Sequence, residues 1–270
     1  MRINNNLMAM NTHRQLGMAN AAGSRSMEKL SSGYRINRAG DDAAGLSISE
    51  KMRGQIRGLT QASRNAQDGI SLIQTAEGAL NETHAILQRM RELVVQAGNA
   101  GTLASEDLQA IQDEIEQLSG EIGGIASRTQ FNGKALLDGT ATSLAFQIGA
   151  NSGQVFTMSI ANMGATALSI NAISVSNFED GALINTIDEA IKAVSAERSK
   201  LGAAQNRLEH TIKNLDNAAE NLQAAESRIR DVDMAQEMME FTKQNILQQA
   251  STAMLAQANQ VPQTVLQLLR

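Results

Sequence analysis

The sequence lacks cysteine and tryptophan, and its 270 residues include one tyrosine, five phenylalanines and a single proline. Without cysteine, the chain has no disulfide, no thiolate nucleophile and no cysteine-ligated zinc site. Aromatic residues make up only 2%, so the rings that supply most of the buried area around a deep pocket are scarce. The single proline, Pro262, leaves nearly the whole chain free to be helical. The composition is typical of a helical rod rather than of a compact enzyme core.

Charge and hydropathy exclude further classes of protein. The formal net charge is −5 and the sequence pI is about 5.3, which argues against a nucleic-acid partner. No apolar run approaches the roughly 18 residues that a membrane span needs, so we expect no membrane insertion. The opening MRINNNLMAM has no basic segment followed by an apolar one, so we expect no Sec-type signal peptide.

Apolar residues recur at alternating steps of three and four in three segments, the pattern of helices that pack as a bundle. One series runs from Ile184 to Ile229, and a helix over about 183–229 would span roughly 70 Å. A second series runs from Met52 to Val94 and a third from Leu108 to Ile125. An isolated helix of this kind is unstable in water, so we expect the three apolar seams to pack together.

Polar and glycine-rich stretches mark the ends of these predicted helices. AGNAGT (Ala97 to Thr102) predicts a break after the second series, because glycine is a poor helix residue. Ser105 is a candidate cap for the next helix. Asp41 and Asp42 are adjacent, so on a helix they would point apart. We interpret them as caps of a helix that begins near Ala43, not as a catalytic carboxylate pair.

Between residues 131 and 178 the hydrophobic period changes from 3.5 to 2. Two alternating runs flank the loop GANSG, which predicts a β-hairpin with a five-residue connection. The runs are Leu144, Phe146, Ile148 and Phe156, Met158, Ile160. Asn132-Gly133 predicts a tight turn, and Ile173 with Val175 suggests a further short strand. Four of the five phenylalanines lie in this region, so we expect a small local core that caps one end of the bundle.

The two ends of the chain differ from the rest in their charge composition. Residues 1–27 contain no acidic residue, and Gln244 to Leu269 contain no charged residue or histidine at all. An apolar stripe continues through the last segment, opposite a face of Gln, Asn, Ser and Thr. Its members are Leu247, Ala250, Met254, Ala258, Val261, Val265 and Leu268. We predict that both ends form amphipathic helices that pair with each other and with further copies of the chain.

No catalytic or ligand-binding constellation is evident. The histidines, His13, His84 and His210, are scattered, and no HExxH or phosphate-binding glycine motif occurs. We therefore predict no enzyme activity, no metal and no cofactor. The stretch LQRMRELVV around Arg89 fits either a solvated face beside an apolar seam or a recognition strip for another protein, and the pattern alone leaves both open.

Long stretches of the sequence resemble bacterial flagellin. The front half carries MRINNN, LSSGYRINRAGDDAAGLSISEKMRGQIRGLTQASRNAQDGISLIQTAEGALNE and LQRMRELVVQAGN. QFNGKALLDG follows, and the back carries AESRIRDVDMAQEM and QASTAMLAQANQVPQTVLQLLR. These matches stand in the family's order and include both ends of the sequence.

The resemblance implies a mainly α fold, a coiled-coil-like bundle of long helices with a small β-hairpin region and paired terminal helices. Residues 1–42 with 230–270 would form the terminal polymerisation domain that lines the inner tube of a filament. Residues 43–229 would form a rod-like helical bundle with the β-hairpin region at about 131–178. The segment of roughly 171–180 is too short to hold an outer variable domain, so we expect a short form that makes a smooth filament.

The resemblance also implies a function: a structural subunit of the extracellular flagellar filament that self-assembles into a helical tube for motility after type III export. Its implied partners are further copies of itself, an export chaperone, and the hook-junction and cap proteins. The terminal segments would be disordered in the free chain and helical in the polymer. The positions that we expect at contacts between subunits are Ile3, Leu7, Met10, Leu247, Met254, Val261, Val265, Leu268 and Leu269.

Flagellins that resemble this chain around LQRMRELVVQ are sensed by an animal innate immune receptor. The matching positions are Gln88, Arg89, Leu93 and, on the next helix, Glu114.

Three alternative functions share parts of the sequence pattern. A hook-filament junction protein or a minor flagellin paralogue would have the same ends. A membrane-active secreted protein would carry basic residues along its polar face, which the C-terminal stretch lacks, and a flagellin with a metalloprotease insert would need HExxH.

Overall fold

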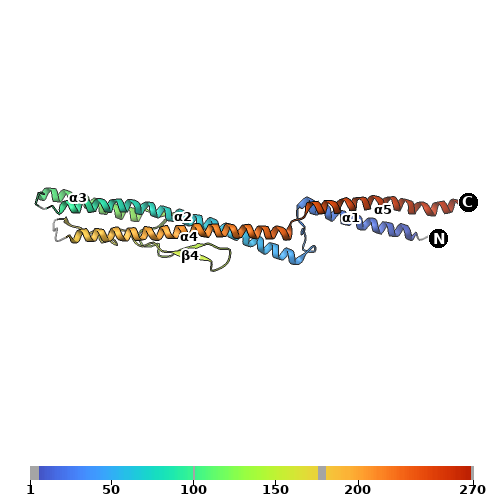
Figure 1. Ribbon diagram of the computed structural model, residues 1–270, viewed down its shortest axis with the longest axis horizontal. Coiled ribbons are helices and arrows are strands. Elements are labelled where there is room, and N and C mark those ends of the chain that lie inside the picture. Colours follow the sequence, from blue (N-terminus) through green and yellow to red (C-terminus); the bar gives the residue numbers. More distant parts are fainter. Residues whose placement is uncertain (1–5, 100, 176–180, 269–270) are drawn as a thin grey trace. The chain divides into compact units, whose positions relative to one another are not determined.

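The computed structural model describes residues 6–99, 101–175 and 181–268, and it is predominantly helical (Figure 1). In chain order the elements are α1 (Leu7–Ser32), α2 (Ala43–Ala97), α3 (Ser105–Arg128), β1 (Gln130–Phe131), β2 (Lys134–Ala135), β3 (Leu144–Gln147), β4 (Val155–Met158), α4 (Ala182–Arg230) and α5 (Met234–Leu268). The expected mainly α fold with a small hairpin region and helical ends is confirmed.

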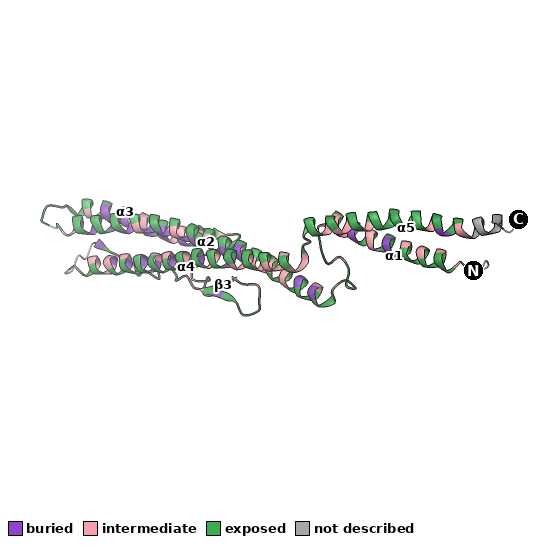
Figure 2. Cartoon of the chain, turned by 45° about the vertical axis from the view of Figure 1, so that its right-hand side comes forward, coloured by how far each residue is buried: buried purple, intermediate pink, exposed green. Residues whose placement is uncertain are grey.

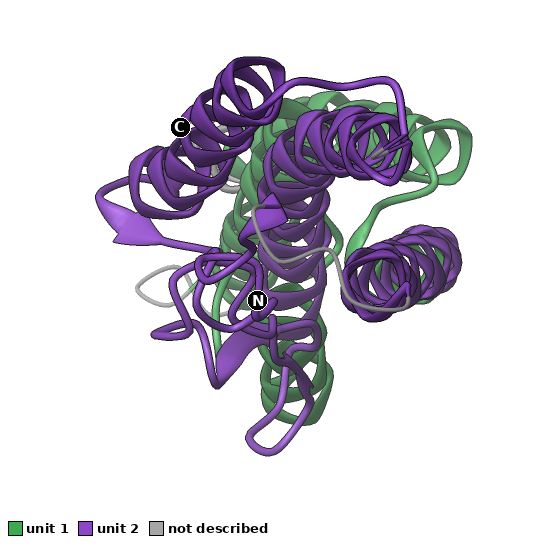
Figure 3. Cartoon of the chain, turned by 90° about the vertical axis from the view of Figure 1, so that its left-hand side faces the viewer, with its two compact units in different colours: residues 1–54, 221–270 green, residues 55–220 purple. Residues whose placement is uncertain are grey.

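Contacts within the chain divide it into two units (Figure 3). The terminal unit comprises Met1–Gly54 and Asn221–Arg270, and the bundle unit comprises Gln55–Glu220. The division falls within α2 and α4. The predicted functional boundaries, after residue 42 and before residue 230, concern roles in a filament and stay a prediction.

The two longest predicted helices are confirmed as α2 and α4, and their seams form the core of the bundle unit. The fully buried seam residues include Ile73, Leu80, Leu87, Val94, Ile187, Val194, Leu201 and Leu208. Polar residues interrupt the seams, and they pair across the helices: Arg91 Nε lies 2.7 Å from Asp188, and Arg198 lies 4.0 Å from Glu77. Three polar residues that interrupt the apolar seams, Glu77, Arg91 and Arg198, are therefore each engaged in an ion pair between α2 and α4.

The starts of α2 and α3 test the predicted caps. Asp42 accepts a hydrogen bond of 2.8 Å from the backbone N–H of Gly45, so the prediction that it caps a helix beginning at Ala43 is confirmed. The prediction for Ser105 is wrong, because Ala104 occupies the cap position and makes no side-chain cap bond. Instead Asp107 reaches back and accepts from the backbone N–H of Ala104 at 3.0 Å, the reciprocal half of a capping box.

Two antiparallel hairpins lie between α3 and α4. Asn132 and Gly133 connect β1 to β2 with φ angles of 48° and 77°, the left-handed pair that a two-residue turn requires. The predicted second hairpin is confirmed, because β3 pairs with β4 in the register Phe146 to Phe156. The two rings stack with their centroids 6.4 Å apart.

The expectation that this region caps one end of the bundle is wrong, because the hairpin packs along the sides of α2 and α4 (Figure 1). The amide of Asn65 donates to the carbonyl of Gln147 at 3.0 Å, and the guanidinium of Arg207 lies 4.8 Å from the Phe156 ring centre. A side chain at Gly58 would bring its Cβ within 2.8 Å of the Ala150 Cβ. Glycine there lets the hairpin loop approach the helix closely.

The suggested strand at Ile173 and Val175 is also wrong, although both side chains are buried. The buried side chain of Gln112 on α3 bonds to this segment in place of a neighbouring strand. Its amide nitrogen donates to the carbonyl of Ile173 at 3.1 Å, and its amide oxygen accepts from the N–H of Val175 at 2.8 Å. A single side chain thus satisfies the backbone groups that a sheet would otherwise pair.

Two adjacent valines on α2 give a matched test of the bundle core. Val94 is fully buried, whereas Val95 is 51% exposed. We expect Val94→Ala to lower the free energy of unfolding by about 2 kcal/mol, because it deletes two buried methyl groups. Val95→Ala should change it by less than about 0.5 kcal/mol, and both changes alter helix propensity equally. Urea unfolding followed by circular dichroism measures both, and equal effects would contradict the assignment of this seam.

Candidate assembly surface

The helices α1 and α5 of the terminal unit expose most of their described large apolar side chains instead of burying them. Fifteen large hydrophobic residues are exposed in the part of the chain that the structure describes, and eleven of these lie on α1 and α5. They are Leu7, Met8, Met10, Met18, Met27, Met234, Met238, Met239, Ile246, Leu247 and Met254. Figure 2 shows this exposure along both helices. Large exposed apolar side chains gathered in this number on two paired helices are typical of an interaction site.

Small residues and polar contacts hold α1 against α5. Among the described side chains of these two helices, the buried ones are Ala19, Ser26 and Ala258, which are small and remove little apolar area from water. The larger Leu16, Leu30, Phe241 and Leu255 are half-buried. Asn6 donates its side-chain amide to the carbonyl of Ala258 at 2.7 Å, and Lys29 lies 3.7 Å from Glu237. The helices therefore run antiparallel, and the pair keeps its apolar faces available.

The predicted assembly positions follow this pattern where the structure describes them. Leu7, Met10, Leu247 and Met254 are exposed, and Val261 is half-buried. Ile3 and Leu269 lie outside the described residues. Val265 and Leu268 belong to helix α5, but their side chains lie outside the description. Sequence reasoning named two of the eight exposed methionines.

A short antiparallel crossing ties the segment after α1 to the segment before α5. The N–H of Arg35 donates to the carbonyl of Arg230 at 2.7 Å, and the N–H of Val232 donates to the carbonyl of Gly33 at 3.0 Å. Between them, Tyr34 and Asp231 form an isolated β-bridge. The sequence analysis missed this crossing, because two residues on each strand carry no hydrophobic period. The only sequence signal is the single tyrosine.

Arg230 is the cation at the centre of this crossing. Its guanidinium lies 4.9 Å from the Tyr34 ring centre, within cation–π range, and 2.7 Å from Glu50 on α2. The hydrogen bond from Arg230 is the largest cause that holds the pKa of Glu50 below its ordinary value, and the charge of nearby Arg53 adds to it. The ionised form of Glu50 is therefore favoured in the folded chain.

Asp41 organises the turn that leads into α2. Its carboxylate accepts hydrogen bonds from the backbone N–H of Arg38 at 2.9 Å and of Asn37 at 3.1 Å. These two bonds hold the pKa of Asp41 below its ordinary value. Both bonds run back to residues that precede α2, so the prediction that Asp41 caps this helix is wrong, whereas Asp42 does cap it.

The predicted recognition strip lies on the bundle unit. Arg89 bonds to Glu114 of α3 at 2.9 Å and to Glu92 at 3.3 Å, and these carboxylates raise its pKa further. Gln88 is exposed and contacts His84 at 3.0 Å. Leu93 differs from the other three positions, because its side chain is 2% exposed and belongs to the bundle core. The surface strip therefore consists of Gln88, Arg89 and Glu114.

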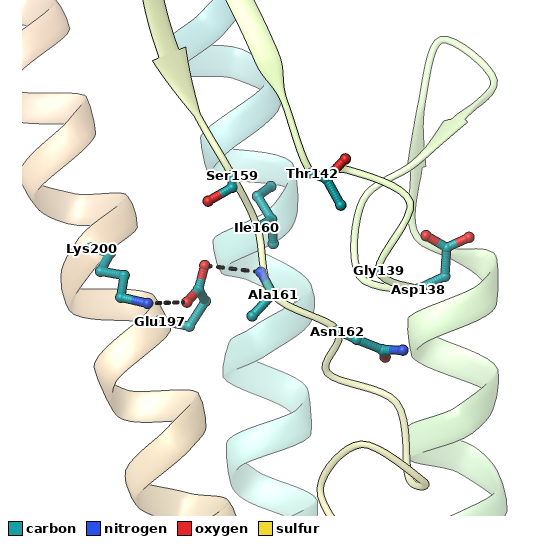
Figure 4. A pocket seen from close by; sticks show the side chains of 9 residues that line it. All are labelled: Asp138, Gly139, Thr142, Ser159, Ile160, Ala161, Asn162, Glu197 and Lys200. Carbon is teal, nitrogen blue, oxygen red and sulfur yellow. Dashed lines mark hydrogen bonds and ion pairs between the residues drawn. The ribbon is translucent and has the colours of Figure 1, made fainter.

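The bundle unit also has a polar cavity of about 520 Å³ beside α4 (Figure 4). Its one buried charged side chain, Glu197, is only 2% exposed. One carboxylate oxygen accepts from the backbone N–H of Ala161 at 3.2 Å, and the other lies 3.0 Å from Lys200. Both oxygens are thus engaged in holding the segment after β4 against the helix. Asp138, across the cavity, bonds to Thr140 within its own turn.

The described part of the chain contains neither a cluster of metal-binding side chains nor a helix suited to span a membrane. Within residues 6–99, 101–175 and 181–268, no group of three or more His, Cys, Asp or Glu side chains is placed to hold a metal ion. None of the helices in these ranges is both long and apolar enough to cross a bilayer. The features that stand out are the exposed terminal helices and the polar strip on α2 and α3.

Comparisons with known proteins cover most of the chain. Residues 3–142 match the family model of the bacterial flagellin N-terminal helical region, and residues 184–269 match that of the C-terminal helical region. The flagellin of Bacillus subtilis (strain 168) is 62% identical over 304 residues, with 100% of each chain covered. The flagellar filament 33 kDa core protein of Treponema phagedenis is 53% identical over 285 residues, with 99% of each covered.

A solved structure is also similar. The crystal structure of Bacillus cereus flagellin has a TM-score of 0.50 and 34% identity to this chain. The match covers 60% of this chain and 94% of that one.

The ion pair of Glu50 with Arg230 makes a testable pH prediction. Because the folded pKa of Glu50 is lowered, the pair stabilises the fold above the ordinary glutamate pKa. This contribution is lost as the pH falls through the lowered value. We expect Arg230→Gln to raise the Glu50 pKa toward its ordinary value, as measured by carboxyl ¹³C NMR titration. Arg53→Gln is the matched control and should raise it less; an equal or larger rise there would contradict the assigned geometry.

Proposed function

The chain belongs to the bacterial flagellin family and is a structural subunit of the flagellar filament, and we propose that α1 and α5 form its buried contacts with neighbouring subunits. The observation that carries this proposal is the set of eleven large apolar side chains exposed on these two helices. Self-assembly follows from the family, and the contacts between subunits are the finer claim. Seven of the nine positions expected from the sequence lie on these two helices, and Ile3 and Leu269 lie outside the described residues.

The charge pattern supports burial of α5 among subunits. A charge removed from water must find a partner, and the stretch Gln244 to Leu269 contains none. Its Gln, Asn, Ser and Thr side chains are able to hydrogen-bond across a contact. Each exposed Leu, Ile or Met that becomes buried contributes about 1.5–3 kcal/mol, and the ordering of chain ends offsets part of that gain.

The domain roles extend this proposal. Residues 1–42 with 230–270 form the inner tube, and residues 43–229 form the surrounding bundle with no outer variable domain. The segment 171–180 is too short for such a domain. Flagellar filaments are extracellular, so the assembled chain acts outside the cell. We further propose type III export in an unfolded form, an export chaperone that binds the C-terminal segment, and contacts with hook-junction and cap proteins.

A substitution at Ile246 tests the assembly surface. This side chain is 61% exposed near the middle of α5, so Ile246→Asp adds a charge where the proposed contact is apolar. We expect the concentration of chain left unassembled on filament seeds to rise about tenfold or more, because a carboxylate would have to be buried unpaired. Pelleting and negative-stain microscopy measure the effect.

The matched control for this test is Ile246→Leu, which conserves volume and apolar character. It should assemble close to the level of the unchanged chain, and both variants should unfold in urea like that chain. Assembly of Ile246→Asp at the unchanged concentration would refute the proposed surface.

We also propose that the free chain is recognised by an animal innate immune receptor through Gln88, Arg89 and Glu114. The supporting observation is that all three side chains are exposed, with Arg89 bridging α2 to Glu114 of α3 and Gln88 next to Arg89 in the sequence. The paired guanidinium and carboxylate present a charge pattern of fixed geometry. In a filament this strip would largely face neighbouring subunits, so recognition requires the monomer.

Replacement of one arginine tests the receptor proposal. We expect Arg89→Ala to raise the half-maximal dose of monomer in a receptor reporter cell assay by about tenfold, because a charged hydrogen-bonding group is lost. Arg128→Ala is the control, since Arg128 is likewise an exposed α-helical arginine paired with a glutamate, Glu121. Equal dose-response curves for Arg89→Ala and the unchanged chain would refute the assignment.

A further inference from the structure

Methionine dominates the exposed apolar surface of the terminal unit. Of the eleven large apolar side chains exposed on α1 and α5, eight are methionines, between 49% and 68% exposed. They are Met8, Met10, Met18, Met27, Met234, Met238, Met239 and Met254. Leucine and isoleucine supply the other three, Leu7, Ile246 and Leu247. Among the described side chains of α1 and α5, thioethers are therefore the most frequent exposed large apolar groups.

The bundle unit treats methionine in the opposite way. Met90 is fully buried and Met163 is 5% exposed, while Met158 is half-buried. The large apolar residues exposed on that unit, within its described part, are Val95 and Val155. The chain thus exposes most of its oxidisable methionines on the two helices proposed for assembly, whereas the described methionines elsewhere are buried or half-buried. An aliphatic surface of Leu and Ile would bury a similar area without that chemical sensitivity.

We propose that these eight methionines are oxidation sites through which peroxide controls assembly, an inference that rests on the assembly function proposed above. The thioether sulfur attacks one oxygen of hydrogen peroxide, a sulfur–oxygen bond forms and the O–O bond breaks. The sulfur is oxidised by two electrons to a sulfoxide, and the peroxide is reduced to water. The carbon skeleton and the net charge are unchanged.

The modification acts by changing polarity. A sulfoxide is polar and chiral where the thioether is apolar and flexible. Its oxygen needs a hydrogen-bond donor, which an apolar contact between subunits does not supply. Oxidation therefore opposes incorporation of a free chain. Burial in the filament shields the same sulfurs, so chains already assembled resist oxidation. Methionine sulfoxide reductases reverse the change, with one enzyme for each sulfoxide epimer.

The first test maps where oxygen is added. Monomer and pre-formed filament receive the same limiting dose of hydrogen peroxide, and peptide mass spectrometry gives the sulfoxide fraction at each methionine. We expect the eight terminal methionines to oxidise several-fold faster in the monomer than in the filament, and Met90 and Met163 to stay largely reduced in both. Oxidation of the two core methionines as fast as the terminal ones would overturn the proposal.

The second test measures assembly. Full-length monomer, treated and untreated, is added to filament seeds, and the concentration left unassembled is measured by pelleting. We expect treatment to raise this concentration about tenfold or more, since each contact would bury a polar oxygen. Incubation of the treated chain with both classes of sulfoxide reductase should restore the untreated value. A treated-to-untreated ratio near one, with sulfoxide confirmed at the eight positions, overturns the proposal.

Two variants separate this chemistry from damage to the fold. One replaces all eight exposed methionines with leucine, and the other carries Met90→Leu with Met163→Leu. The ratio of treated to untreated is taken within each variant, so altered basal assembly cancels. We expect the ratio to fall toward one in the first variant and to stay high in the second. The reverse result would place the sensitivity in the core and overturn the proposal.

The Ile246→Asp variant separates a failure of the methionine proposal from a failure of the proposed assembly surface. If Ile246→Asp blocks assembly while the treated unchanged chain assembles normally, the methionine proposal fails and the assembly surface stands. If Ile246→Asp itself assembles normally, the proposed surface fails, whatever the peroxide result.

Discussion

The terminal helices α1 and α5 pair without burying most of their large apolar side chains. The proposed assembly depends on this exposure. Among the described side chains of α1 and α5, only Ala19, Ser26 and Ala258 are buried, and most of the large apolar ones are exposed. The hydrophobic effect is proportional to apolar area removed from water, so this pair gains less from its own contact than full burial would give. The large side chains stay exposed in the single chain, and in the proposed assembly other copies of the chain would cover them.

The bundle unit solves the same problem within one chain. Its helices present seams of Ile, Leu and Val to one another, and the polar interruptions are paired, as with Arg91 and Asp188. The hairpin β3–β4 covers the flank of α2 and α4, where Gly58 admits its loop. This unit needs no further copy to bury its core. The division of labour explains why charges are distributed through the bundle but absent from the end of α5.

Regular features of the molecule were predictable from the sequence, and irregular ones were not. The helices α2 and α4 follow from the 3.5-residue period of their apolar residues, and β3–β4 follows from a period of two. The cap of α3 was misplaced because Asp107 reaches backward, a choice between two local bonds that composition does not decide. Gln112 replaces a whole strand beside Val175, and the crossing at Tyr34 depends on backbone bonds between segments about 200 residues apart. Such contacts carry no local signal.

The exposure of the candidate assembly surface was also not predictable from the sequence. Hydrophobic periodicity identifies a stripe such as Leu247 and Met254, but it does not say whether a stripe is buried within the chain or left exposed. Leu93 makes this plain: it directly follows two exposed residues, Arg91 and Glu92, and yet its own side chain is 2% exposed and belongs to the bundle core. Exposure is a property of the partner helix as much as of the stripe. The pairing of α1 with α5 leaves Leu247, Met254 and most of the other described large apolar residues of both helices exposed, so these side chains stay open to solvent in the single chain.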